Sequence, residues 1–181
     1  MSVPQIDSHT VDRTPKLEDI AQEYRDFIAK FSTALLSTAD GSGTPNISYA
    51  PTVFVGEAFY VYISDLAKHT RNLMENPQVA LMFIEDEGGC QQIYARTRVI
   101  LDCQAKMVEP GDHWHSIMNE FALQFGEIMQ TLTALPDFRL LRLEPEGGQY
   151  VKGFGQAYRI TGPRLDRLVH IDRKEQGGVQ G

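Results

Sequence analysis

Side chains that can hold an anion are concentrated in residues 60–84, between two apolar runs typical of β-strands. The segment joining these runs places leucines at positions 66 and 73 among charged residues, which predicts a helix over 66–75. Ser64 is positioned to be the N-cap of this helix, and Lys68 and Arg71 follow one turn later. Free N–H groups at a helix N-terminus, together with two cations, suit a phosphate or a carboxylate. The same spacing is also typical of a solvated surface helix, so both interpretations stay open.

A second group of cations lies on a strand predicted over residues 91–108. By alternation, one face of that strand carries Tyr94, Arg96, Arg98 and Ile100. The two guanidinium groups would lie roughly 7 Å apart, a spacing that can hold a pair of carboxylates or one phosphate. The alternative is two solvated arginines on an exposed edge.

Three further patterns resemble cofactor sites but do not fit one. His113 and His115 are two positions apart on a predicted helix, so their side chains diverge and a shared metal ion is not expected. Cys90 and Cys103 have no C-x-x-C spacing, which favours reduced thiols in the cytoplasm. The glycines on either side of Phe154 lack the third glycine and the following helix of a dinucleotide-binding loop.

Composition narrows the class of protein. The chain has 181 residues, 42% of them hydrophobic, which is enough for one substantial core. A formal net charge of −7 argues against a nucleic-acid partner, which would require a basic surface. No cationic and apolar leader and no uninterrupted apolar run of about 18 residues is present, so we expect a soluble cytoplasmic protein without a membrane partner.

Periodicity predicts a mainly β (α+β) fold. Helical spacing of apolar residues predicts helices over 17–31, 113–135 and 163–171. Alternating or β-branched runs predict strands over 33–38, 46–55, 58–63, 78–84, 91–108, 138–143 and 149–161. An antiparallel β-barrel with peripheral helices fits this order, as a single domain over residues 16–171. Residues 1–15 and 172–181 have no period and are predicted to be flexible.

Several runs resemble one known superfamily. The segment YISDLAKHTRNLMENPQVALMF (residues 62–83) resembles a segment of the pyridoxamine 5′-phosphate oxidase-like split barrels, matching it at Lys68, Leu73, Asn76, Pro77 and Leu81. NISYAPTV (46–53), YARTR (94–98), FGEI (125–128) and VKGFGQAY (151–158) look more specifically like the HutZ/HugZ heme-utilisation branch. The resemblance covers about residues 20–171.

What this resemblance implies is a homodimeric split β-barrel that binds heme at the subunit interface and possesses, in some members, oxygen-dependent heme-degrading activity. Lys68, Arg71, Arg96 and Arg98 would then neutralise the propionates, and Tyr94 would flank the macrocycle. His170 would ligate the iron, with His69 as the other candidate ligand. Asp137 matches an acidic position that hydrogen-bonds the iron-ligating histidine in this branch. The electron donor is not identified by the sequence.

The superfamily also implies an alternative, an FMN-dependent oxidoreductase in which Ser64, Lys68 and Arg71 hold the phosphate. Flavin members carry an arginine and a lysine on the strand before the central corner, where this chain reads SYAPTVFV. A third possibility is a dimeric binding protein without a cofactor.

Overall fold

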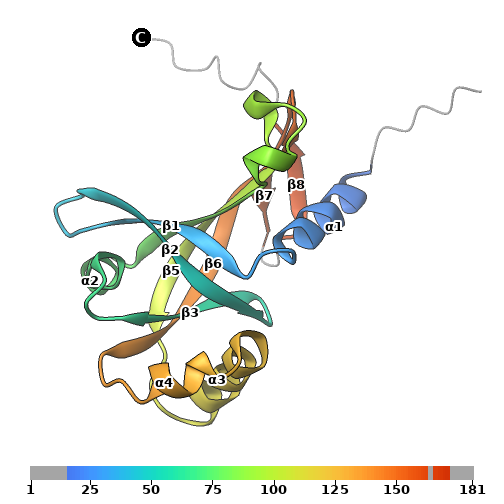
Figure 1. The fold of residues 1–181 in the computed structure, drawn as a ribbon. Helices are drawn as coiled ribbons and strands as arrows, with labels where there is room; N and C mark the ends of the chain where they lie inside the picture. Colours follow the sequence, from blue (N-terminus) through green and yellow to red (C-terminus); the bar gives the residue numbers. More distant parts are fainter. Residues whose placement is uncertain (1–15, 163–164, 172–181) are drawn as a thin grey trace, which may run out of the picture.

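A closed antiparallel barrel forms the centre of the molecule (Figure 1). The computed structural model describes residues 16–162 and 165–171. Of the eight strands in these residues, six close the barrel in the order β3-β2-β1-β4-β5-β6, because β3 also pairs with β6. Their bounds are Thr33–Ala39 (β1), Pro45–Val55 (β2), Ala58–Ser64 (β3), Gln78–Ile84 (β4), Arg98–Met107 (β5) and Phe138–Gly153 (β6). The predicted barrel with peripheral helices is confirmed.

Strand β6 is longer than predicted and joins two parts of the sheet. Its first residues pair with β3, its last with β7 (Gln156–Thr161), and β5 runs beside most of its length. The sequence predicted two strands, 138–143 and 149–161, whereas the chain continues to Gly153 and then turns at Phe154 and Gly155. Gly155 has φ 71°, a conformation that favours glycine in a tight turn.

The helix predicted over 163–171 is wrong. Residues 163–164 lie outside the described part of the chain, and Arg167–His170 forms β8, which pairs with β7. Leu168 points into the core while its neighbours are exposed, so the alternation of a strand replaces the helical spacing. The two ends predicted to be flexible, residues 1–15 and 172–181, also lie outside the described residues.

Within the described part of the chain, four α-helices surround the barrel: α1 (Leu17–Ile28), α2 (Lys68–Glu75), α3 (Asp112–Phe125) and α4 (Ile128–Thr133). The single helix predicted over 113–135 is broken at Gly126, whose φ of 72° ends α3 and turns the chain toward α4. No helix in the described residues combines the length and the apolar content needed to cross a membrane.

Two hydrophobic clusters hold these layers together. The inward-facing strand residues form one cluster with Tyr24 of α1 and Leu73 of α2. The outward face of β3 forms the other, where Tyr60 and Tyr62 pack beneath Phe121 of α3. Figure 1 shows α3 and α4 covering this face, while α1 lies beside β8.

The rest of the barrel's outward face carries an apolar row. Register places Tyr49 opposite Leu35, Leu35 opposite Met82, and Met82 opposite Ile100. These four residues, called here the outer apolar row, cross β2, β1, β4 and β5. Tyr49 is 65% exposed, and α3 and α4 pack on a different face of the barrel. Leu35, Met82 and Ile100 are partly exposed, and an apolar row on the outside of a barrel is typical of an interface.

Candidate functional site

The central corner between β3 and α2 is built differently from its prediction. Helix α2 begins at Lys68, and its N-cap, Ala67, makes no side-chain capping bond. The hydroxyl of Ser64 instead accepts a hydrogen bond from the N–H of Leu66 (3.1 Å) and donates one to Oδ2 of Asp137 (2.6 Å). The predicted N-cap role of Ser64 is therefore wrong. Its hydroxyl bonds to an N–H in the turn before the helix and to a carboxylate distant in sequence, and not to the helix N-terminus.

Ser64 and Asp137 are held together by the backbone as well. The N–H of Asp65 donates to the carbonyl of Asp137 (2.7 Å), and Ser64 pairs with Phe138 in the β3–β6 ladder. The hydroxyl of Thr70 donates to the carbonyl of Ser64 (2.6 Å). The corner is therefore fixed by a main-chain hydrogen bond, by strand pairing and by a side-chain hydrogen bond.

Arg139, two positions after Asp137, forms its ion pair with Asp65. Arg139 donates to both carboxylate oxygens of Asp65, at 3.1, 3.0 and 2.8 Å. The hydrogen bonds and charge of Arg139 hold the pKa of Asp65 below its ordinary value. The Asp137 carboxylate has a different neighbour, Tyr62, whose pKa is raised by burial and by the negative charge of Asp137.

The cations of α2 lie at the surface of the corner. Lys68 is exposed, and Arg71 is exposed with one guanidinium nitrogen donating to the carbonyl of Leu66 (2.8 Å). His69 is half-buried, with Nδ1 2.8 Å from the hydroxyl of Ser48 on β2. The structure thus brings Ser64, Lys68, His69 and Arg71 to one short segment, with His69 turned toward the barrel.

His69 should make stability depend on pH. Burial lowers its pKa below the ordinary value of 6.5, so the unfolded chain binds the proton more readily. Its contribution to stability is present above about pH 6.5 and is lost as the pH falls. His69→Gln, which keeps a polar group beside Ser48, should narrow the difference in melting temperature between about pH 7.5 and about pH 5. His115→Gln, at an exposed position on α3, is the control. An unchanged pH dependence in His69→Gln would contradict the assignment.

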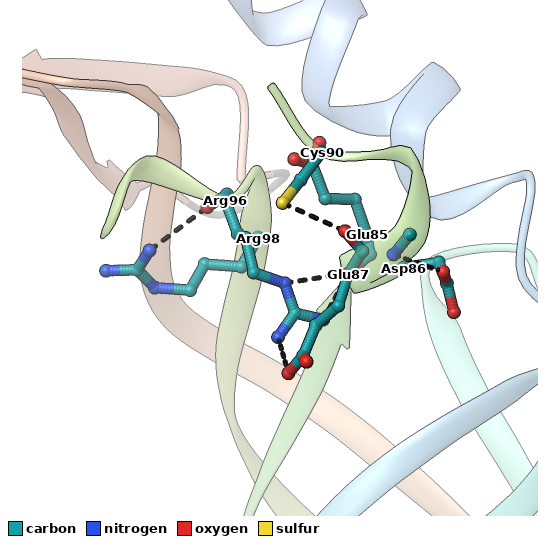
Figure 2. A network of polar contacts seen from close by, with 7 residues as sticks. Glu85, Asp86, Glu87, Cys90, Arg96 and Arg98 are labelled. Atoms are coloured by element: carbon teal, nitrogen blue, oxygen red, sulfur yellow. Dashed lines mark hydrogen bonds and ion pairs between the residues drawn. The ribbon is translucent and has the colours of Figure 1, made fainter. Parts of the chain in front are cut away.

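The arginine pair does not share a strand face. Strand β5 begins at Arg98, and residues 85–97 form a loop with short 3₁₀ turns at Glu87–Gly89 and Ile93–Ala95. Figure 2 shows the guanidinium of Arg96 reaching across this loop, where Nε and Nη2 donate to the carbonyl of Glu85 and Nη1 pairs with the Glu87 carboxylate (2.9 Å). Arg98 donates to the carbonyl of Arg96 (3.0 Å). The prediction of a strand over 91–108 holds for Arg98–Met107 and is wrong for residues 91–97, which lie in the loop where the two arginine side chains bond to carbonyls.

Tyr94, at the tip of this loop, is 86% exposed. The hydroxyl of Thr97 lies 3.5 Å from the carbonyl of Lys152, so the loop lies against the end of β6. Phe154 follows in the β6–β7 turn and is 81% exposed. Two exposed aromatic rings therefore occur at this end of the molecule.

His170 lies at the same end, as the last residue of β8. Its Nε2 is 3.3 Å from the carbonyl of Gly155, and its ring meets the Tyr158 ring edge-on at 5.2 Å. Tyr158 pairs with Tyr150 on β6. Tyr150 is 12 positions after Phe138, which corresponds to a length of up to about 40 Å along β6 at about 3.3 Å per residue. His170 and Asp137 are therefore not brought together within one subunit.

One large cavity was not anticipated from the sequence. It has a volume of about 880 Å³ and lies between the end of α1 and the β2–β3 hairpin. Its lining includes four aromatic rings in a chain of contacts 4.7 to 5.8 Å apart, those of Phe31, Phe54, Phe59 and Phe83. None of the described residues that line it is a histidine, so this lining offers no imidazole to an iron atom. No cluster of three or more potential metal-ligating side chains occurs in the described residues.

Comparison with known proteins identifies the family. Residues 20–152 match the family described as Pyridoxamine 5'-phosphate oxidase. A protein named Heme oxygenase HutZ, from Vibrio cholerae, is 45% identical over 151 residues, which cover 83% of this chain and 86% of that protein.

Two solved structures extend the comparison. One, described as HutZ, the heme storage protein from Vibrio cholerae, has a TM-score of 0.68 and 40% identity, covering 79% of this chain and 96% of the other. Campylobacter jejuni ChuZ has a TM-score of 0.79 and 32% identity, covering 88% of this chain and 65% of the longer ChuZ chain. The chain belongs to the pyridoxamine 5′-phosphate oxidase family, and within it to the HutZ-type branch of split-barrel proteins.

Proposed function

We propose that this protein binds heme and takes part in heme utilisation, as an oxygen-dependent heme-degrading enzyme or as a heme carrier. The observation that supports this most strongly is the 45% identity to a heme oxygenase over 83% of the chain. Bound heme would supply the oxygen chemistry, with electrons from an external donor.

The residues at the β7–β8 end suit a porphyrin. Imidazole is a common axial ligand of heme iron, and His170 is exposed with one ring nitrogen near a backbone carbonyl. Tyr94 and Phe154 offer flat apolar surfaces nearby.

The cofactor's carboxylates require cations. Lys68 and Arg71 are exposed on α2, and Arg98 is half-buried at the start of β5, so each is a proposed contact for a propionate. Arg96 has a different proposed role, because three of its nitrogens bond within the loop: it holds the segment that carries Tyr94.

We further propose a homodimer that pairs through the outer apolar row. An isologous interface repeats one patch on both subunits and would cover Leu35, Met82 and Ile100 together with the exposed ring of Tyr49. It would also explain the distance between His170 and Asp137. Two-fold pairing can bring the start of β6 in one subunit near the β7–β8 end of the other, so that Asp137 hydrogen-bonds the partner's His170.

Hemin titration tests the function directly. We expect a Soret band that saturates at about one hemin per subunit, because specific ligand sites are few per protein. Absence of saturable hemin uptake would overturn the heme proposal. Flavin absorption in the purified protein would instead favour the FMN alternative. The sequence of β2 argues against that alternative, because this strand contains no lysine or arginine.

A further inference from the structure

We infer that Ser64 is a positioning residue for the heme iron, acting through Asp137 rather than touching the cofactor. This inference rests on the proposed function and on the proposed hydrogen bond between Asp137 and the partner's His170. It replaces the anion-binding role that the sequence suggested for Ser64.

The direction of the Ser64 hydrogen bond follows from its partners. A hydroxyl has one proton to donate. Ser64 Oγ accepts from the Leu66 N–H, and a carboxylate can only accept, so the proton points at Oδ2 of Asp137. At 2.6 Å this is a short, charge-assisted hydrogen bond.

The rest of the corner leaves the other oxygen of Asp137 for another donor. The main chain of Asp137 is fixed by the N–H of Asp65, and Arg139 is committed to the Asp65 carboxylate. Among the residues that the structure describes, no hydrogen bond or ion pair engages Oδ1 of Asp137. The Ser64 hydroxyl therefore fixes the rotation of the carboxylate and with it the direction in which Oδ1 can accept an imidazole N–H.

The orientation of the Asp137 carboxylate affects the strength of the bond between the iron and its histidine ligand. A carboxylate that accepts the N–H of a ligating histidine fixes its ring and makes it a stronger donor. Without the Ser64 hydroxyl, the Asp137 side chain can rotate, because its backbone alone remains held. The bond between iron and His170 should then weaken although the ligand itself is still present.

The test compares four hemin-loaded variants by the iron–histidine stretching frequency of the reduced protein. Ser64→Ala should lower the frequency toward that of Asp137→Asn, and Ser64→Thr, which restores a hydroxyl, should recover the wild-type value. Thr70→Val is the matched control, because it removes a hydrogen bond to the Ser64 carbonyl without touching Asp137. Its frequency should stay at the wild-type value. Thermal unfolding of each variant checks that the fold is intact.

The outcomes separate this inference from the proposed function. If Asp137→Asn shifts the frequency and Ser64→Ala does not, the role of Ser64 alone is overturned. A rise in frequency in Ser64→Ala also overturns it, since the hydroxyl would then be lowering the basicity of the Asp137 carboxylate. An equal shift in Thr70→Val overturns it as well, since the hydroxyl would then only be stabilising the corner. If Asp137→Asn leaves the frequency unchanged, the proposed Asp137–His170 pair fails and Ser64 with it.

Discussion

His170→Ala is expected to abolish the Soret band of the hemin-loaded protein or to shift it strongly. Loss of a residue that only orients a metal ligand commonly weakens metal affinity by about 10-fold to 100-fold, so loss of the ligand itself should cost at least as much. His170 is exposed on β8 and belongs to neither core cluster, although its ring contacts Tyr158 at the edge of one, so the variant should fold. Hemin titration followed by absorbance is the measurement.

His69→Ala is the matched control, because His69 is the other histidine near the proposed cations. It should retain the wild-type spectrum. If His69→Ala destroys the Soret band while His170→Ala preserves it, the iron ligand is His69 and the heme proposal itself survives.

Ile100→Glu should convert the dimer to a monomer. Ile100 lies at the end of the outer apolar row, and isologous pairing would bury two copies of the new carboxylate in an apolar interface. Burying one unpaired charge costs on the order of 3 kcal/mol or more, which is about 100-fold in a dissociation constant. Light scattering at micromolar concentration measures the mass, which is 20.4 kDa for one chain.

Hemin affinity should fall in the same variant, because the proposed site takes residues from both subunits. Leu123→Glu provides the control, since Leu123 is 81% exposed on α3, away from the row. It should remain dimeric. A dimeric Ile100→Glu protein, or a wild-type monomer, would contradict the proposed interface.

The barrel could be predicted because its strands are set by local patterns. Buried and exposed positions alternate in β1 and β4, and the turn residues between β1 and β2 have typical hairpin chemistry. The arrangement β3-α2-β4 was likewise expected from the apolar runs on either side of the charged helix. These features depend on neighbours close in the sequence.

The site was harder to predict because its contacts join residues distant in sequence. Ser64 matched a helix-capping pattern, yet its hydroxyl is committed to a carboxylate 73 positions away. Arg96 matched a strand face, yet its guanidinium is committed to Glu85 and Glu87 across a loop. A polar side chain has several geometrically allowed partners, and only the folded chain decides between them. The strand β8 was missed for a similar reason, since a short edge strand depends on pairing with β7.

The position of β6 also limits how the length of this chain can change during evolution. The first half of β6 is in register with β3 and β5, and the second half with β5 and β7. A residue inserted in either half would reverse the inward and outward faces against two partners unless a β-bulge absorbed it, as the register shift at Asp102 and Cys103 already does once. Gly148 adds a second restriction, since a β-carbon there would lie 2.2 Å from the carbonyl oxygen of Ile100. Loops such as residues 85–97 carry no comparable register. Insertions that lengthen relatives of this protein should therefore be found in loops and at chain ends, with the length of β6 preserved.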